Sequence, residues 1–293
     1  DVPLVVLAAG RATRYGGIQP LAPVGPSTEA ILDVLAGDAL AAGFGSIVLV
    51  VGTETGDALR AHVEEAWPRR AARTFCTQGD PRGTVDAVLA AKGAIGDGRS
   101  FGVANADDLP GRAALALLAR HLVQPGTPSA VVCFALESSL LGDEPVTRGV
   151  CRVGEDELLR SLTERRQVHR DGSRGRIVAG DGLEPAVLDP GTPVSMNLFG
   201  FRPHMLDVLD GAMRAGAAGH EVLLPDVVDA LCAGRLGSAP ETRALCVLRA
   251  RGRCIGVTHA ADTTLVHDAL ADEVGRGERP VDVWADTPGK SPA

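Results

Sequence analysis

Lysine is almost absent from this chain of 293 residues, and aromatic residues are scarce. Lys92 and Lys290 are the only lysines among 29 Lys and Arg residues, so arginine carries nearly all of the fixed positive charge. Aromatic residues make up 3% of the chain, which predicts a core of aliphatic side chains. Because the formal net charge is −8, the chain lacks the positive field that nucleic acids and anionic membranes favour, and we expect it to bind neither.

Cysteine pairs and long apolar runs are missing as well. The six cysteines include no Cys-x-x-Cys pair, and each lies in or beside an apolar run, which favours free buried thiols in a reducing compartment over disulfides or zinc. No apolar run approaches the ~18 residues of a membrane span. The short N-terminal run has no basic lead-in, so we interpret it as a first strand and not as a signal peptide. We therefore expect a cytoplasmic protein.

The chain does contain enough apolar material for a sizeable core. Hydrophobic residues make up 45% of it and charged residues 23%, as in folded soluble proteins. Short apolar runs alternate with segments of helical periodicity, so we expect strands at 2–8, 46–51, 73–78, 101–106 and 130–135, and helices at 28–42, 57–67, 84–95 and 113–123. This alternation predicts an α/β, Rossmann-like fold with a mainly parallel sheet and helices on both faces. Ligands of such sheets bind beyond the carboxyl ends of the strands.

The second half differs in character, because strands joined by glycine-rich turns dominate it. Strands are expected at 148–153, 158–166, 176–178, 194–201, 244–248 and 254–257, and helices at 205–215, 224–232 and 261–274. Since no Pro/Ser-rich linker separates the halves, we expect a single domain over 1–288, in which a β-rich half, 137–288, elaborates the first half, 1–136. The tail, 289–293, is expected to be disordered.

The turn after the first strand, Leu-Ala-Ala-Gly-Arg-Ala-Thr-Arg at 7–14, is compared with three kinds of phosphate-binding loop. A Walker A loop needs a lysine that is absent here, and a dinucleotide loop needs G-x-G-x-x-G, whereas Gly10 is followed only by Gly16 and Gly17. The nucleotidyltransferase pattern L-A-x-G-x-x-x-R fits. In such a loop backbone N–H groups face a phosphate, and Arg14 supplies charge-assisted hydrogen bonds. A plain strand–helix connection is the alternative.

Further motifs follow in order: QGDPRGTVDAV (78–88), VANADD (103–108), TRGVCRV (147–153), LTERRQV (162–168), VSMNLFGF (194–201), LLPDVV (223–228) and GVTHAAD (256–262). With the opening loop, they make the chain, from about Val2 to about Val274, resemble bacterial nucleotidyltransferases of the sugar-1-phosphate nucleotidylyltransferase (NDP-sugar pyrophosphorylase) superfamily. The resemblance implies the nucleotide-diphospho-sugar transferase fold, with a nucleotide-binding first half and a sugar-phosphate-binding second half. It also implies that a sugar-1-phosphate, or a sugar-like phosphate such as a cyclitol phosphate, attacks the α-phosphorus of a nucleoside triphosphate, assisted by Mg²⁺, and releases pyrophosphate.

The resemblance assigns the nucleotide to two segments. The expected nucleotide-binding residues are Leu7, Ala8, Ala9, Gly10 and Arg14 in the loop, and Gln78, Gly83 and Thr84 in the base-reading turn. A glutamine amide can pair with a base edge through both a donor and an acceptor, and a glycine lets the base lie against the backbone. The alternative for the second segment is a turn followed by a helix start.

Two aspartates match the superfamily's metal ligands, and with Arg14 they are the expected catalytic residues. Asp107 ends a strand at the mouth of the site, and hard cations such as Mg²⁺ prefer carboxylate oxygens. Its neighbour Asp108 is interpreted as the N-cap of the helix at 111–123 or as a support for the metal site. Asp262 is the second expected ligand, although it precedes a helical segment and is equally compatible with a helix cap.

The sugar-phosphate site is expected at Gly149, Glu164, Arg165 and Asn197. In the resembled enzymes the acid at the position of Glu164 binds sugar hydroxyls, and the cation at the position of Arg165 binds the sugar phosphate. Arginine is a competent phosphate ligand. Gly149 and Asn197 match positions that line the sugar pocket. The alternatives are a solvated charged run, a turn glycine and a polar strand residue.

One departure from the pattern concerns a lysine that follows the opening loop in the resembled enzymes and offsets phosphate charge. Gln19 stands at that position and carries no charge. Arg11, Arg14 or Arg165 compensates for it, or the lysine was deliberately replaced, or the protein is a catalytically weakened relative that binds or senses a nucleotide or nucleotide-sugar. An NAD-type oxidoreductase is a third function class, disfavoured because G-x-G-x-x-G is absent.

Overall fold

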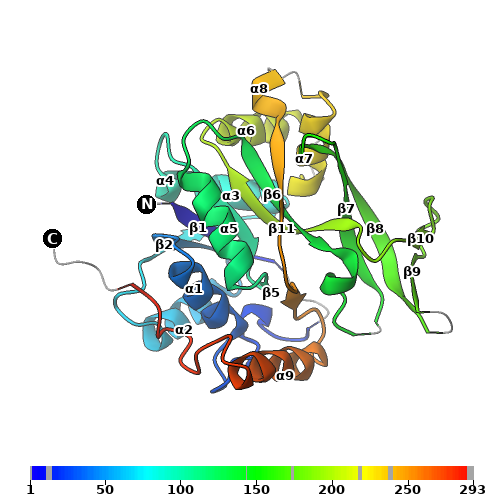
Figure 1. Ribbon diagram of the computed structural model, residues 1–293. Coiled ribbons are helices and arrows are strands. Elements are labelled where there is room, and N and C mark those ends of the chain that lie inside the picture. The colour runs from blue at the N-terminus through cyan, green and yellow to red at the C-terminus, as the bar shows by residue number, and fades with distance from the viewer. Residues whose placement is uncertain are drawn as a thin grey trace.

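The structure is a computed structural model that describes residues 2–10, 15–142, 144–172, 175–216, 220–236 and 240–288. Arg11 and Arg14 of the opening loop, and the tail 289–293, lie outside the described residues. In the described part an 11-stranded sheet is covered by helices, and a separate two-stranded sheet lies beside it (Figure 1).

Four parallel strands form the half of the sheet that carries the expected nucleotide site. They are β1 (Pro3–Ala8), β2 (Ser46–Val51), β3 (Arg73–Thr77) and β4 (Phe101–Asn105), in the spatial order β4-β1-β2-β3. β1 and β2 are nearly continuous runs of buried aliphatic residues. Such runs are typical of parallel strands covered on both faces.

Helices cover both faces of these strands, and each face has its own hydrophobic cluster. One cluster takes in residues of α1 (Ile31–Ala41), α2 (Gly56–Ala66), α5 (Arg112–Val123) and α9 (Asp262–Gly275). The other takes in residues of α3 (Thr84–Ala90), α4 (Lys92–Ile95), α6 (Met205–Ala215) and α7 (Leu224–Cys232). Alternation of strands and helices along the sequence therefore produces the two covered faces that it predicts.

β11 (Pro193–Phe201) converts the parallel sheet into a mixed one. It pairs antiparallel with three strands, β4, β6 (Ser129–Ala135) and β7 (Val146–Val153). From β7 the sheet continues antiparallel through β8 (Leu159–Asp171), β9 (Arg176–Ala179) and β10 (Val187–Leu188), while β12 (Leu245–Arg249) runs parallel to β6. Figure 1 shows β7 to β10 extending away from the parallel strands as an arm. This β-rich second half was expected from its glycine-rich turns.

Short elements complete the chain, and several of them lie near the site. They are two 3-10 turns, η1 (Gln19–Leu21) and η2 (Leu136–Ser139), the helix α8 (Pro240–Arg243), and the two-stranded sheet of β5 (Asp108–Leu109) and β13 (Ile255–Gly256). Strand and helix positions otherwise agree with the sequence predictions to within a few residues. The expected helix at 84–95 is two helices that meet at Ala91, and β8 extends beyond its expected end to Asp171.

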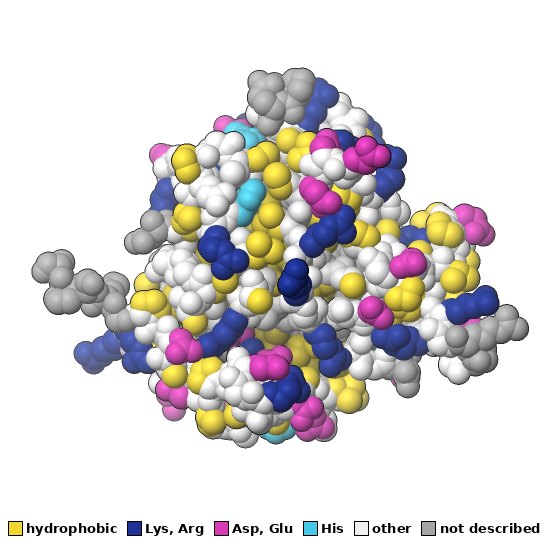
Figure 2. All heavy atoms as spheres, in the orientation of Figure 1, with side chains coloured by type: hydrophobic (Ala, Val, Ile, Leu, Met, Phe, Trp, Pro, Cys, Tyr) yellow, Lys and Arg dark blue, Asp and Glu magenta, His cyan; other side chains and the backbone are white. Residues whose placement is uncertain are grey.

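Four further features of the described residues bear on the class of protein. The fold is the expected α/β fold with a mixed, mainly parallel sheet. All six cysteines are free thiols, of which three are buried as expected and three, Cys76, Cys232 and Cys246, are half-buried. In the part of the chain that the structure covers, no helix is both long and apolar enough to cross a bilayer. Figure 2 shows acidic and basic side chains interspersed over one face, so the net negative charge is not concentrated there.

Candidate active site

Two adjoining cavities lie beyond the carboxyl ends of the parallel strands. Their volumes are about 280 Å³ and about 700 Å³, and Ala9, Gly10, Gln78 and Pro81 line both. Because they share these residues, the two cavities form one cleft over the ends of β1 and β3. This is where ligands bind in sheets of this topology.

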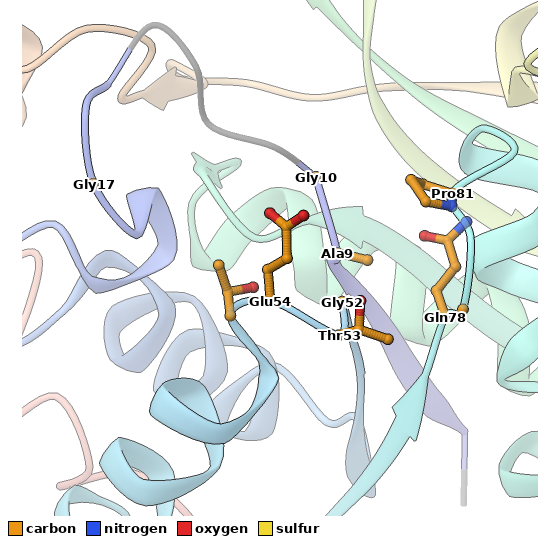
Figure 3. Close-up of a pocket in the computed structure, with 10 residues that line it drawn as sticks. Ala9, Gly10, Gly17, Gly52, Thr53, Glu54, Gln78 and Pro81 are labelled. Atoms are coloured by element: carbon orange, nitrogen blue, oxygen red, sulfur yellow. The ribbon is translucent and has the colours of Figure 1, made fainter.

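The smaller cavity lies between the turns that follow β1, β2 and β3 (Figure 3). Gly52, Thr53, Glu54 and Thr55 line it from the turn after β2. Figure 3 shows the carboxylate of Glu54 pointing into the cavity near Gly10. These residues were not predicted as part of the site. Their position directly after a buried parallel strand could have indicated them, because ligands of such sheets bind at the turns that follow the strands.

Gln78 forms the wall of both cavities, and its side chain is held rigidly. It is 4% exposed, and its Nε2 donates to Gly83 O at 3.1 Å and to Asp86 Oδ2 at 2.9 Å. The amide has two N–H groups, and both are thereby used inside the protein. The amide was expected to offer both a donor and an acceptor to a base, but this geometry leaves only the acceptor, whose oxygen faces the cavity in Figure 3.

Gly83 and Thr84 connect this turn to the segment that enters α7. Val222 N donates to Arg82 O at 2.9 Å, and Leu224 N donates to Thr84 Oγ1 at 2.8 Å. Gly83 has a φ of +99°, and a Cβ there would overlap the backbone of Val222. A glycine is therefore required by the close approach of the two chain segments.

The larger cavity combines residues from both halves of the chain. Besides the shared residues it is lined by Leu7, Gly83, Thr84, Ala87, Asn105, Asp107, Asn197, Glu221 and Leu223. Asn197 lies at a bulge of β11, where pairing with β6 shifts register, and its φ of +58° is unusual for a residue other than glycine. Strained backbone of this kind is concentrated at functional sites. Asn105 belongs to the VANADD motif at an expected strand end, whereas Glu221 was not expected from the sequence.

Asp107 lies where three remote segments meet. Gln19 Nε2 donates to Asp107 Oδ2 at 2.7 Å and also to Val257 O, and Val257 N donates to Asp107 O at 3.0 Å. The turn η1, the end of β4 and the residue after β13 are thus joined around this carboxylate.

Asp262 has a different environment. It is the first residue of α9, and its Oδ2 accepts hydrogen bonds from Thr258 N at 2.8 Å and His259 N at 2.7 Å. The carboxylate therefore closes the turn before the helix, whereas the N-cap position is taken by Ala261. Among the described residues that line the two cavities, Asp107 is present and Asp262 is not. Its metal-binding role stays a prediction.

Asp108 does not cap the following helix. It belongs to β5, its Oδ2 accepts a hydrogen bond from Asn105 Nδ2 at 3.0 Å, and α5 begins at Arg112 after Gly111. Burial raises the pKa of Asp108, while the Asn105 hydrogen bond and the charge of Arg148 oppose that shift. The hydrogen bond from Asn105 to Asp108 holds the Asn105 side chain, which lines the larger cavity.

Three of the expected sugar-phosphate residues, Gly149, Glu164 and Arg165, lie in the arm, and Asn197 lies in β11, which pairs with it. Glu164 and Arg165 are neighbours in β8 and so point to opposite faces. Burial and the nearby Glu164 raise the pKa of Asp226, which places Glu164 on the face that carries α7. Gly149 lies between the two strands that hold Glu164 and Ser195, close to the bulge of Asn197.

Arg165 is occupied within the protein. It is 4% exposed and donates to Asp181 through Nε at 2.8 Å and Nη2 at 3.1 Å, and Nη2 also reaches Leu183 O and Pro185 O. The Arg165 hydrogen bond is the main cause that holds the pKa of Asp181 well below its usual range. Arg165 lines a separate groove of about 590 Å³. Its contact with a phosphate stays a prediction.

The charge of the described cleft is negative. Glu54, Asp107 and Glu221 line the two cavities, and no Lys or Arg does so within the part of the chain that the structure describes. A polyphosphate beside Asp107 therefore requires a cation between the two anions, or charge from outside these lining residues.

Comparison with known proteins agrees with this geometry. The family of MobA-like NTP transferase domains matches residues 4–224. A crystal structure of UDP-glucose pyrophosphorylase in complex with UDP-glucose superposes with a TM-score of 0.61 and 15% identity, covering 93% of this chain and 99% of that chain. This likeness shows the shared fold, and a search of curated proteins by sequence found no match. The chain belongs to the family of MobA-like NTP transferase domains and is therefore a nucleotidyltransferase.

Proposed function

We propose that the protein transfers a nucleoside monophosphate from a nucleoside triphosphate to a sugar-1-phosphate or a sugar-like phosphate such as a cyclitol phosphate. The observation that carries the proposal is the shared wall of the two cavities. Ala9, Gly10 and Gln78 join a smaller cavity of base size to a larger one that ends at Asp107 and Asn197. One ligand can therefore extend from the turn after β3, past the opening loop, to the second half of the chain.

The proposed reaction is a displacement at the α-phosphorus. A phosphate oxygen of the acceptor forms the new bond, the bond from the α-phosphorus to the oxygen bridging the β-phosphate breaks, and pyrophosphate leaves with that electron pair. Positioning of two anions that repel each other accounts for most of the catalysis. The base lies against Gln78, the phosphates pass Ala9 and Gly10, and the acceptor lies near Asn197 and Glu221.

Magnesium fits the oxygen donors that face the larger cavity. Asp107 would hold the ion together with water, Asn105 is a further oxygen donor among the lining residues, and Asp262 remains the second proposed ligand. When bound, Mg²⁺ neutralises charge on the phosphates that meet at the α-phosphorus. This fit rests on the carboxylates of the cleft and on the absence of Lys and Arg among its described lining residues. A triphosphate beside Asp107 requires added positive charge, because the two anions repel each other.

The test is a screen of the nucleoside triphosphates against sugar-1-phosphates and cyclitol phosphates, with pyrophosphate release as the readout. We expect one pair to react in the presence of Mg²⁺, and Asp107→Asn to lower the rate by about 10²-fold or more. Asp97→Asn, an equal charge change at an exposed turn, is the matched control and should leave the rate unchanged. Absence of pyrophosphate from every pair would contradict the proposal.

A nucleotide sensor is the second candidate, and Gln19 favours it. Its neutral amide is bonded to Asp107 and Val257 and supplies no charge to the phosphates. Calorimetry on the wild type and on Asp107→Ala, each with and without Mg²⁺, separates the two candidates. Binding that is independent of the metal and unchanged by the substitution supports the sensor, whereas loss of binding in both cases supports the enzyme.

A further inference from the structure

We infer that Asp86 is a specificity-determining positioning residue, which locks the Gln78 amide so that the nucleobase must present an N–H donor to it. The inference rests on the proposed function, because it concerns the base of the triphosphate. Asp86 lines neither of the two cavities in the described structure, so its role is separate from those of the residues that contact the ligand in the proposed function.

The lock consists of two hydrogen bonds to one carboxylate. Asp86 Oδ2 accepts from Gln78 Nε2 at 2.9 Å, and Arg82 Nη2 donates to Asp86 Oδ1 at 2.7 Å. Asp86 lies in the first turn of α3, and its side chain is 13% exposed. Each carboxylate oxygen is therefore engaged, and the helix fixes the backbone that carries it.

The chemistry of the partners determines which way the amide points. Gly83 O and the Asp86 carboxylate are both acceptors, so the end of the Gln78 amide that lies near them must be the nitrogen. A rotated amide would place Oε1 against two other oxygens and lose both hydrogen bonds. The amide oxygen consequently faces the smaller cavity, as Figure 3 shows.

A fixed acceptor discriminates between bases that differ by exchange of donor and acceptor. Uracil and cytosine, or hypoxanthine and adenine, invert this pattern at the ring nitrogen and at the exocyclic group of the same edge. A site whose acceptor is built to receive an N–H donor from one base binds poorly a base that presents an acceptor at the same position. An amide free to rotate would accept both members of each pair.

The experiment measures the binding of UTP, CTP, ITP and ATP by calorimetry in Mg²⁺ to the full chain and to Asp86→Asn. We expect the wild type to prefer one member of its pyrimidine or purine pair by about tenfold or more. In Asp86→Asn the new amide can donate to a rotated Gln78, and we expect the preference to fall by about fivefold or more with the melting temperature little changed. Asp80→Asn, an exposed acid of the same turn, is the matched control and should keep the wild-type ratio.

A second measurement uses the wild type alone and so does not depend on the folding of a variant. Methylation of the base nitrogen that donates to Gln78 should weaken binding of the preferred triphosphate by about tenfold or more. If no triphosphate binds the wild type, the proposed function itself fails. If a triphosphate binds but Asp86→Asn and Asp80→Asn change its preference equally, or every methylated base binds like its parent, the role of Asp86 is overturned.

Discussion

Gln19 Nε2 donates a hydrogen bond of 2.7 Å to Oδ2 of Asp107, across 88 positions of the sequence. The same nitrogen donates to Val257 O, and Val257 N donates to Asp107 O. Gln19 stands where the resembled enzymes have a lysine. Its side chain holds the N-terminal turn η1 and the residue after β13 against the carboxylate of Asp107. What it does not supply is positive charge.

Gln19→Lys tests the consequence of this neutral replacement. An ammonium group has three donors, so it can keep both hydrogen bonds and add charge beside the phosphates. We expect kcat for pyrophosphate release to rise by about tenfold, a part of the ~10²-fold that one charged transition-state contact contributes. Gln19→Ala is the control, because it removes the hydrogen bonds without adding charge and should lower kcat. A Gln19→Lys rate equal to wild type, or a raised Mg²⁺ requirement alone, would contradict this account.

Asp262→Asn decides between a metal ligand and a turn-closing carboxylate. Its hydrogen bonds to Thr258 N and His259 N involve an ionised acceptor and stabilise the turn before α9. If that is its sole role, the variant loses about 1–3 kcal/mol of stability and keeps its Mg²⁺ dependence. If Asp262 is a ligand, the Mg²⁺ concentration for half-maximal rate rises, as in Asp107→Asn. Thermal melts and Mg²⁺ titrations of both variants distinguish the two outcomes.

The sequence predicted the strands and helices well because each has a strong local pattern. β2 is a buried run of aliphatic residues and α6 an amphipathic segment, and both have the predicted bounds. The partners of a side chain depend on residues that are remote in the sequence, so local patterns predicted them less well. The guanidinium of Arg165, whose contact with a phosphate stays a prediction, lies against Asp181 and Leu183 O, sixteen and eighteen positions away, and no local pattern indicates these partners. Likewise, no local pattern indicates that Gly83 packs against Val222.

Asp181→Asn should reduce stability in a pH-dependent way. The folded-state pKa of Asp181 lies well below the ordinary value of 3.8, chiefly because of the Arg165 hydrogen bond. A group whose pKa is depressed by folding stabilises the protein above its unfolded pKa and loses that contribution as the pH falls toward its folded pKa. We therefore expect the wild type to have the higher melting temperature at pH 5–7. The difference between the two melting temperatures should shrink progressively as the pH falls below about 4 toward the folded-state pKa.

The conservative variant Arg165→Lys is the control for this pair. A lysine keeps the charge but loses the two-pronged geometry, so it should recover only part of the stability. A melting-temperature difference between the wild type and Asp181→Asn that stays constant from pH 7 to pH 2 would show that the carboxylate does not stabilise the fold through its charge.

Gly83→Ala is expected to affect both stability and acceptor binding. At a φ of +99° an added Cβ is strained and meets the backbone of Val222, which costs about 1–3 kcal/mol. Relief of the overlap moves Val222 away, and with it Glu221 and Leu223, which line the larger cavity. We expect a lower melting temperature and a raised KM for the acceptor. Gly93→Ala, at a helical position with open space around it, is the matched control and should be neutral or stabilising. Equal stability of the two variants would show that the approach of Val222 to Gly83 does not require a glycine.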